Sequence, residues 1–305
     1  MRYVRNFLGT VSMPWHPDFS FDQATFRKSV RVLVSSGMRD LYLFATAGEG
    51  YAVTVGQFRQ VTEAFADEHA AAGGIDPMIG VVGISLATSL KRVGVAHSLG
   101  LRDFQFSLPP WSALTGKETT AVFVAFCDGF PDSRCMHYSL ARSGRIVSPR
   151  AYGALAVRRE GLVATKYGAS EPNQVAGMLR EAPQLHHFFT KNGCFLGAAL
   201  GKCGLIASVA SSNPVRARVF VDAGASGDMD RPPALYAELS ALSAALATAI
   251  GPGRIDGTHD KVIHQLANPA FPLRLLPPFE GSTDAEFESY RQVMRQQSPQ
   301  WLPSP

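Results

Sequence analysis

The sequences DLYLFA at residues 40–45 and MIGVV at residues 78–82 decide the fold. Both runs are short and predominantly apolar, and an amphipathic stretch at 55–72 separates them. Apolar runs without alternation are typical of strands that are covered on both faces of a parallel sheet. The stretch between them has the length and spacing of a helix. Residues 40–82 are therefore predicted to form a strand–helix–strand unit.

The same alternation continues in both directions from this unit. It predicts further strands at 7–13, 104–107, 135–138, 162–166, 187–189 and 205–209, and further helices near 88–99, 118–127, 149–157, 173–180 and 195–200. Eight such units in about 200 residues predict an α/β fold, a (β/α)8 TIM barrel. A doubly wound open sheet is the alternative. It is disfavoured because no G-x-G-x-x-G motif follows the first strand, where a dinucleotide-binding fold carries one.

The last third of the chain is predicted to be helical, with helices at 233–250, 260–268 and 283–297. We interpret these as the last barrel helix followed by a C-terminal helical extension. Residues 1–225 are then the barrel domain, and residues 226–305 are C-terminal helices packed on it.

The composition excludes several classes of protein. The chain of 305 residues is 46% hydrophobic and 18% charged, as expected of a packed globular protein. Its formal net charge of +4, without a basic run longer than two, argues against nucleic acid as a partner. Because no stretch approaches 18 consecutive apolar residues, no membrane partner is expected.

Two features of the sequence favour the cytoplasm. The N-terminal segment, residues 1–6, leads into a short apolar stretch without a small-residue cleavage site, so no secretory signal is expected. The four cysteines, at positions 127, 135, 194 and 203, form no C-x-x-C motif. Their spacing supports neither a zinc site nor a disulfide framework and fits a reducing compartment.

Three polar side chains follow predicted strands at the point where each strand ends: Thr46, Tyr138 and Lys166. In a parallel barrel these ends form the reactive face. Lys166 is a candidate nucleophile that forms a Schiff base with a carbonyl compound, which requires surroundings that lower its pKa from about 10.4. The alternative is a surface lysine whose stem covers apolar residues while its ammonium stays in water. The position of Lys166 at the end of a strand does not by itself decide between these two interpretations.

Tyr138 and the turn after the second strand supply complementary chemistry. A phenol donates and accepts protons, which imine formation requires, although Tyr138 could equally fill the top of the barrel. The turn ATAGEG at residues 45–50 has small residues and glycines, so its backbone N–H groups can approach an anion such as a carboxylate. An ordinary strand–helix turn is the alternative.

Metal-dependent and serine-hydrolase chemistry are disfavoured. The eight histidines form no H-x-x-x-H pattern, and no G-x-S-x-G motif is present. Consecutive side chains of a strand point to opposite faces. His186 and His187 therefore cannot bind one ion together, and His137 faces the helices if Tyr138 faces the interior. No metal ligands are predicted.

At these positions the sequence resembles the dihydrodipicolinate synthase/N-acetylneuraminate lyase family, lysine-dependent (β/α)8 enzymes that form an imine with pyruvate or another 2-keto acid. The resemblance extends to about residue 215. The family's G-T/S-T-G-E turn corresponds to ATAGE at 45–49, and its strand-5 tyrosine to Tyr138 in HYSL at 137–140. Lys166 follows at the separation expected of the family, and GKCGLI at 201–206 resembles the G-a-x-G-x-I stretch that opens strand 8.

The resemblance implies a role for each matching residue. Lys166 forms the imine, so no separate cofactor is needed, and Tyr138 moves protons to and from the substrate. Thr46, Ala47 and Gly48 form the turn that holds the substrate carboxylate through backbone N–H groups and the Thr46 hydroxyl. The backbone carbonyl of Ile206 lines the pocket near the imine. The resemblance also implies a homo-oligomer, a dimer or a tetramer.

Three departures from the family pattern bear on the substrate. Ala47 lacks the hydroxyl that the family has there. Trp111, in SLPPW at 107–111, stands where a synthase has a tyrosine that completes the neighbouring subunit's proton relay, and an indole cannot relay a proton in this way. It would suit a flat or apolar substrate tail, as in the hydratase-aldolase branch of the family. Arg142 contacts a distal carboxylate or is a solvated loop cation.

These departures argue against dihydrodipicolinate synthase itself. They favour a lyase or aldolase that acts on pyruvate or a pyruvate-derived 2-keto acid through a lysine Schiff base and an enamine. Two alternatives remain open: dihydrodipicolinate synthase, and a descendant of the family that binds a keto acid without turnover.

Overall fold

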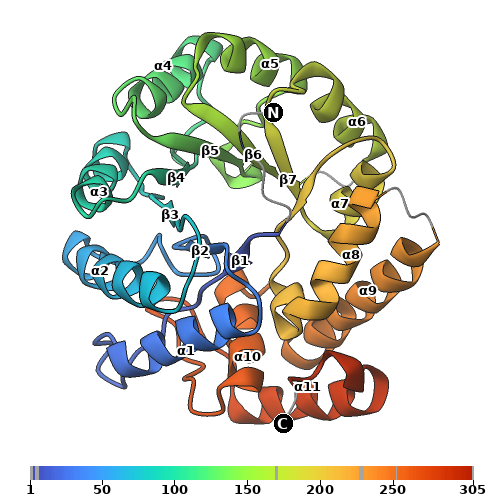
Figure 1. Ribbon diagram of the computed structural model, residues 1–305. Coiled ribbons are helices and arrows are strands. Elements are labelled where there is room, and N and C mark those ends of the chain that lie inside the picture. Colours follow the sequence, from blue (N-terminus) through green and yellow to red (C-terminus); the bar gives the residue numbers. More distant parts are fainter. Residues whose placement is uncertain (1–2, 4–6, 169–170, 227–229, 252, 304–305) are drawn as a thin grey trace.

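The computed structural model describes residues 3, 7–168, 171–226, 230–251 and 253–303. Residues 1–2 and 4–6, in the segment where no secretory signal is predicted, lie outside this description. Within the described residues, eight parallel strands pair in chain order (Figure 1). They are β1 Gly9–Thr10, β2 Leu41–Leu43, β3 Met78–Gly80, β4 Asp103–Phe106, β5 Arg134–Ser139, β6 Leu162–Tyr167, β7 His186–Phe189 and β8 Gly204–Leu205.

The sheet closes into a barrel between its first and last strands. The Leu8 N–H donates to the Leu205 carbonyl at 3.1 Å, next to a parallel bridge between Phe7 and Leu205. Closure confirms the predicted (β/α)8 barrel, and the open doubly wound sheet is excluded.

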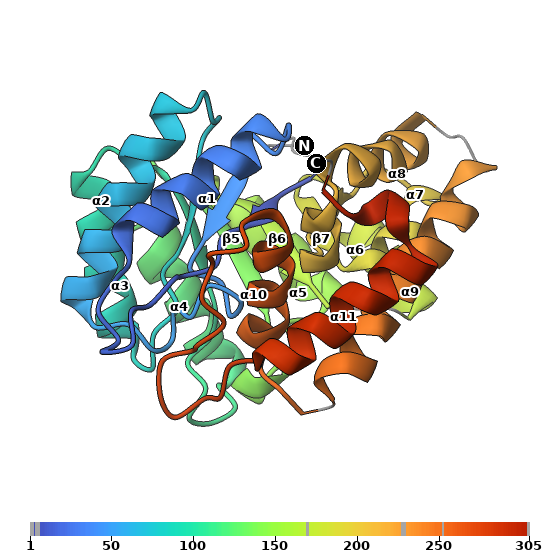
Figure 2. The ribbon, with the colours of Figure 1, turned by 90° about the horizontal axis from the view of Figure 1, so that it is seen from below.

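Helices surround the barrel in a ring (Figure 1). They are α1 Gln23–Ser35, α2 Val55–Ala71, α3 Leu86–Ser98, α4 Gly116–Cys127, α5 Pro149–Arg158, α6 Pro172–Glu181, α7 Lys191–Ala198 and α8 Pro214–Ser226. The C-terminal helices are α9 Arg231–Ile250, α10 Asp256–Ala267 and α11 Asp284–Gln297. Short 3-10 turns lie at η1 Ala141–Ser143, η2 Ser208–Ser212 and η3 Pro299–Trp301. Figures 1 and 2 both show α10 between α1 and α11, and Figure 1 shows it close to β1.

Several predicted boundaries differ from the structure. The first strand is two residues rather than 7–13, and residues 208–212 are the 3-10 turn η2 rather than strand. The helices α1 and α8 were not predicted, and the last barrel helix is α8 at Pro214–Ser226 rather than one of the helices predicted after residue 232. In α1, Phe26, Val30 and Leu33 bury one face and the Asp22 side chain caps the N-terminus. Helices α7 and α10 each begin four residues before the predicted start. Neither has a side-chain capping hydrogen bond: the N-cap residue of α7 is Thr190, and that of α10 is Ile255, which cannot cap.

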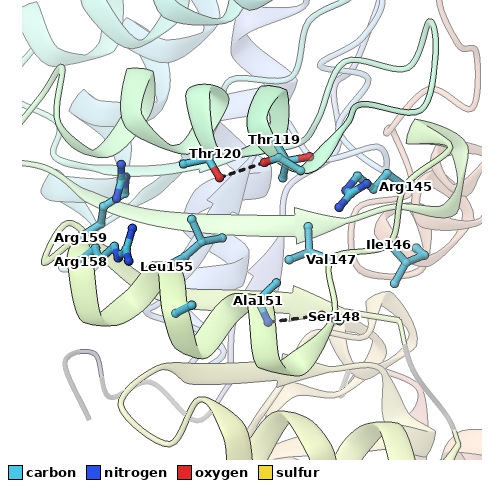
Figure 3. Close-up of a pocket in the computed structure, with 12 residues that line it drawn as sticks. Thr119, Thr120, Arg145, Ile146, Val147, Ser148, Ala151, Leu155, Arg158 and Arg159 are labelled. Carbon is cyan, nitrogen blue, oxygen red and sulfur yellow. Dashed lines mark hydrogen bonds between the residues drawn. The ribbon is translucent and has the colours of Figure 1, made fainter.

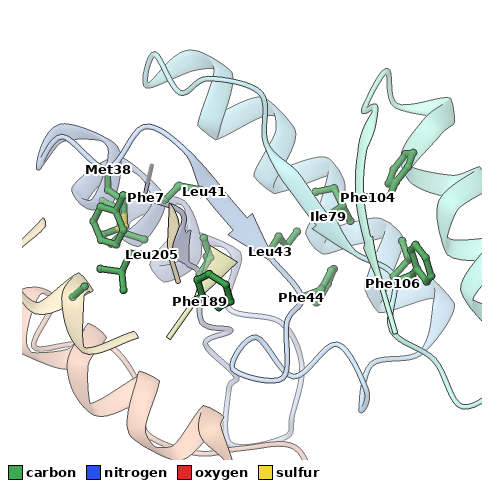
Figure 4. Packing of buried hydrophobic residues seen from close by; sticks show 14 of the residues in the cluster. Phe7, Met38, Leu41, Leu43, Phe44, Ile79, Phe104, Phe106, Phe189 and Leu205 are labelled. Carbon is green, nitrogen blue, oxygen red and sulfur yellow. The ribbon is translucent and has the colours of Figure 1, made fainter. Parts of the chain in front are cut away.

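Successive side chains of a strand point to opposite faces of the sheet, so the buried apolar side chains form two clusters, one towards the helices and one inside the barrel. Leu41 and Leu43 point out towards the helices, and Figure 4 shows Leu41 beside Phe7 and Leu43 near Phe44. Tyr42, between them, points into the barrel, where it clusters with residues such as Met136 and Ala164. Tyr138 and Lys166 lie two positions beyond Met136 and Ala164 on the same strands, so both side chains face the interior at the carboxyl end of the barrel.

By length and composition alone, α9 is the one helix of the described residues that could cross a membrane. One such helix is weak evidence, because the core helix of a globular protein passes the same test. Its leucines 235, 239, 242 and 246 are buried, and α9 packs against α7, α8 and α11. These contacts account for its apolar composition as core packing.

Candidate active site

Tyr138 and Lys166 are brought together, as the sequence predicts. They are direct partners in the register of β5 and β6, and the Lys166 Nζ lies 4.0 Å from the centre of the Tyr138 ring. The same nitrogen lies 5.9 Å from the ring centre of Tyr42, which is fully buried. The faces of two aromatic rings therefore hold the Lys166 amine at the mouth of the barrel.

Lys166 lines a cavity of about 430 Å³. Tyr138 and Ile206 line it, which agrees with the predicted position of Ile206. Thr190 and Lys191, at the beginning of α7, form another part of the wall, and burial lowers the pKa of Lys191. The cavity therefore contains two amines, Lys166 and Lys191, and either could meet a carbonyl compound.

One side of this cavity is a surface that the sequence analysis missed. Asp256, His259, Asp260 and Ile263 of α10 all line it, and their spacing of i, i+3, i+4 and i+7 places them on one helix face. That spacing was readable in the sequence. The predicted start of the helix at residue 260 left Asp256 and His259 outside it.

Asp260 is the most deeply buried polar group of this α10 face, with 2% of the residue exposed. Its Oδ1 accepts a hydrogen bond from the Thr10 hydroxyl at 3.0 Å. Burial is the main cause that raises its pKa to about 7, and the nearby charge of Asp256 adds to this. Hydrogen bonds from Ser208 and Thr10 and the positive charge of Lys166 act in the opposite direction.

The turn after β2 has the geometry of an anion-binding loop. Phe44 and Glu49 flank it with positive φ angles of 62° and 54°, a conformation that non-glycine residues rarely adopt. A Cβ on Gly48 would lie 2.8 Å from the Val11 carbonyl oxygen, so only glycine fits. In the described structure, the backbone N–H groups of Thr46 and Ala47 donate to no protein acceptor.

A buried network anchored on Glu49 fixes this turn. Trp15 Nε1 donates to its Oε1 at 2.9 Å, and the Leu276 N–H donates to its Oε2 at 2.7 Å. The Lys261 Nζ lies 2.6 Å from Oε1, and both side chains are completely inaccessible. Burial lowers the pKa of Lys261 to about 8, while the charge of Glu49 raises it. The ion pair thus ties α10 to the turn.

Thr46 and Arg142 line a second, smaller cavity of about 90 Å³, together with Tyr51 and Ser107. Burial raises the pKa of the Tyr51 phenol, and the charge of Arg142 acts against this. Thr46 and Arg142 are thus brought together, but in a different cavity from Tyr138 and Lys166. Trp111 lines neither cavity: 79% of the residue is exposed, and its predicted contact with substrate is untested.

A third cavity, of about 340 Å³, lies on the outer face of the ring and contains none of the predicted site residues. It lies between α4 and α5, with Arg145 at one end and Arg158 and Arg159 at the other (Figure 3). Because reactive groups of a parallel barrel gather at the strand ends, the cavity of Lys166 is the candidate site instead.

The sequence matches the model of the dihydrodipicolinate synthetase family over residues 3–258. It is 24% identical to the 4-hydroxy-tetrahydrodipicolinate synthase of Moorella thermoacetica over 295 residues, which cover 95% of this chain and 97% of that protein. It is 25% identical to the enzyme of the same name from Xanthomonas axonopodis over 235 residues, covering 75% and 76% of the two chains.

Solved structures show the same fold. A prophage protein of the dihydrodipicolinic acid synthase family from E. coli K12, in complex with pyruvate, superposes with a TM-score of 0.85. It is 16% identical and covers 95% of this chain and 97% of its own. The N-acetylneuraminate lyase from Fusobacterium nucleatum superposes with a TM-score of 0.83 at 16% identity, covering 96% and 98%.

Proposed function

Because this chain belongs to the dihydrodipicolinate synthetase family, we propose that it is a class I lyase or aldolase that binds a 2-keto acid as an imine of Lys166. The observation that carries this proposal is the pairing of Lys166 with Tyr138, whose ring centre lies 4.0 Å from the amine at the mouth of the barrel. The pyruvate complex of the E. coli relative supports pyruvate, or a compound derived from it, as the keto acid.

In the proposed reaction the Lys166 nitrogen attacks the keto carbon, and loss of water gives the imine. The phenol of Tyr138 moves protons to and from the carbinolamine oxygen. The family resemblance assigns the substrate carboxylate to the N–H groups of Thr46 and Ala47, which donate to no protein acceptor in the described residues. Since Thr46 lines the smaller cavity, this role requires a substrate that reaches from the Lys166 cavity to the turn. Removal of a proton, or cleavage of a bond, next to the imine carbon then gives the enamine that aldol and dehydration chemistry share.

The substrate is proposed to differ from that of dihydrodipicolinate synthase. Ala47 provides no hydroxyl in the turn, and Trp111 replaces the tyrosine of the family's intersubunit relay. Instead, the cavity beside Lys166 is lined by Lys191 and by the α10 residues Asp256 and Asp260. Dihydrodipicolinate synthase activity remains the alternative, and a direct assay decides between them.

Trapping with borohydride tests the imine. The purified protein is incubated with pyruvate, and with a panel of other 2-keto acids, in the presence of borohydride, and the intact mass is measured. One adduct on a peptide that contains Lys166 is expected. Replacement of Lys166 by arginine abolishes the adduct, whereas the matched change Lys191→Arg in the same cavity leaves it in place.

Two outcomes would contradict the proposal. An adduct that survives in Lys166→Arg and disappears in Lys191→Arg moves the reaction to the other amine. Keto-acid-dependent thermal stabilisation without any adduct, retained in Lys166→Ala, indicates the descendant that binds without turnover. Cytoplasmic location and assembly into a dimer or tetramer are part of the proposal.

A further inference from the structure

The α10 wall of the Lys166 cavity contains a buried carboxyl group without a cationic partner. In the described part of the chain, no lysine, arginine or histidine nitrogen lies within ion-pair distance of Asp260. Its partners are hydroxyls: Thr10 at 3.0 Å, and Ser208. A buried carboxylate is normally paired, because its desolvation is costly.

Glu49 provides a direct comparison in the same protein. It is as deeply buried as Asp260, but it has Lys261 at 2.6 Å, an indole N–H and a backbone N–H. That set of partners satisfies both carboxylate oxygens and describes a structural ion pair. Asp260 lacks such a set, faces a cavity and lies near the Lys166 charge. Its surroundings therefore leave it able to exchange a proton.

We propose that Asp260 is a second proton-transfer residue of the imine site, facing Lys166 across the cavity and acting in addition to Tyr138. The proposal rests on the proposed function, and it assigns a reactive group to α10, outside the strands that bear Lys166 and Tyr138. The pKa of about 7 that burial gives Asp260 suits this role, since a group exchanges protons best near its pKa.

Imine formation then uses two proton transfers at Asp260. The Asp260 carboxylate takes a proton from the Lys166 ammonium, directly or through one water. The lone pair of the Lys166 nitrogen forms the C–N bond to the keto carbon, and the π pair of the C=O bond moves onto the oxygen. Tyr138 then transfers one proton from the nitrogen to that oxygen. The Asp260 carboxyl then protonates the resulting hydroxyl, the C–O bond breaks, and water leaves as the C=N bond forms. The carboxylate is restored opposite an iminium cation.

The other titratable groups that face this cavity come from four elements. They are Asp256 and His259 on α10, Tyr138 on β5, Lys166 on β6 and Lys191 on α7. The test therefore has to separate Asp260 from its neighbour Asp256, one helical turn earlier on the same face. Asn substitutions at the two positions make the same chemical change, at the buried Asp260 and at the exposed Asp256.

The experiment measures the rate of borohydride-trapped adduct formation with pyruvate between pH 5.5 and pH 9, a range we choose to bracket neutrality. The wild type is expected to show an inflection near the pKa of Asp260, about 7. Asp260→Asn is expected to lose that inflection and to form the adduct about 10²-fold more slowly. Asp256→Asn is expected to keep the inflection and to move it to lower pH, because the charge of Asp256 raises the pKa of Asp260. An Asp260→Asn profile that superposes on the wild type within threefold would falsify the proposal.

A second variant keeps the test decisive if Asp260→Asn does not fold. Thr10→Val removes a hydrogen bond that lowers the pKa of Asp260, and valine matches the shape of threonine. In the Thr10→Val protein, the inflection in the pH profile of adduct formation is expected to move to higher pH. An inflection at the wild-type pH overturns the role of Asp260. Absence of any adduct in the wild type is a different result, because it overturns the proposed function itself.

Discussion

The Lys166 amine lies over the face of the Tyr138 ring, 4.0 Å from its centre, and not at the end of its hydroxyl. The ring and the phenol oxygen of Tyr138 therefore contribute separately. The ring face stabilises and positions the charged amine, while the oxygen is left for the substrate.

Tyr138→Phe separates these two contributions. The ring remains, so Lys166 stays in place, but proton transfer to the carbinolamine is lost. We expect adduct formation with pyruvate to slow by about 10²- to 10⁴-fold, with little change in thermal stability. Tyr152→Phe is the control, because the Tyr152 phenol forms a hydrogen bond with His137 Nδ1, at 2.6 Å, on the outer side of β5. A Tyr138→Phe protein that reacts at the wild-type rate removes the phenol from the mechanism.

The pair between Glu49 and Lys261 is expected to be essential for stability. Lys261→Met leaves a buried, unpaired carboxylate and should lower the free energy of unfolding by about 3–5 kcal/mol. The double change Glu49→Gln with Lys261→Met should recover part of this loss. Urea denaturation measures both. The exposed pair of Arg180 and Glu181 is the control, and its loss should change stability by no more than about 1 kcal/mol. Equal effects at the two pairs would contradict the structural role.

Mild acid is expected to destabilise the fold through buried histidines. Burial lowers the pKa of His137 to about 3 and those of His187 and His264 to about 4. Below pH 6.5 the unfolded chain protonates these rings before the folded chain does, so stability is present above about pH 6.5 and is lost as pH falls towards 4. Asp260 works in the opposite sense, because its raised pKa lets the folded chain hold a proton up to about pH 7.

With three histidines acting in one direction and Asp260 in the other, the unfolded chain binds about two more protons than the folded chain. Each of these protons changes the free energy of unfolding by about 1.4 kcal/mol per pH unit. Urea unfolding at pH 6.5 and pH 5.0 measures the slope. Asp260→Asn removes the opposing proton and should steepen it by about 1.4 kcal/mol per pH unit. A free energy of unfolding that is flat over this interval contradicts the buried, neutral histidines.

Trp111 is expected to anchor an oligomer. Its side chain is 79% exposed in the single chain, and a large exposed aromatic is typical of the centre of an interface. Light scattering after size exclusion should give a dimer or tetramer for the wild type and a smaller species for Trp111→Ala. Val157→Ala, another exposed apolar side chain at 76%, should leave the mass unchanged. A monomeric wild type would contradict this expectation directly.

The barrel and the proximity of Tyr138 to Lys166 could be predicted because local patterns encode them. Short apolar runs identified the strands, and alternation from Met136 to Tyr138 and from Ala164 to Lys166 fixed which side chains face inwards. The turn at 45–50 was likewise readable from its glycines. Each inference needs only a few neighbouring residues and the rule that parallel strands share one reactive end.

The α10 wall could not be predicted in this way. Asp260 meets Thr10 across 250 positions of sequence, and Lys261 meets Glu49 from the same helix. Periodicity indicates that a helix has a polar face but not what that face covers. Sequence reasoning also placed Thr46 and Lys166 at one rim without distinguishing the two cavities that the structure assigns to them.

Because α10 supplies both Asp260 and Lys261, the site is completed late in the synthesis of the chain. All eight strands have left the ribosome once residue 205 has emerged, but the partner of Glu49 and the far wall of the cavity come only with Asp256–Ala267. A nascent barrel therefore carries Lys166 before the helix that forms the far wall of its cavity has been made, and the complete cavity needs nearly nine-tenths of the polypeptide.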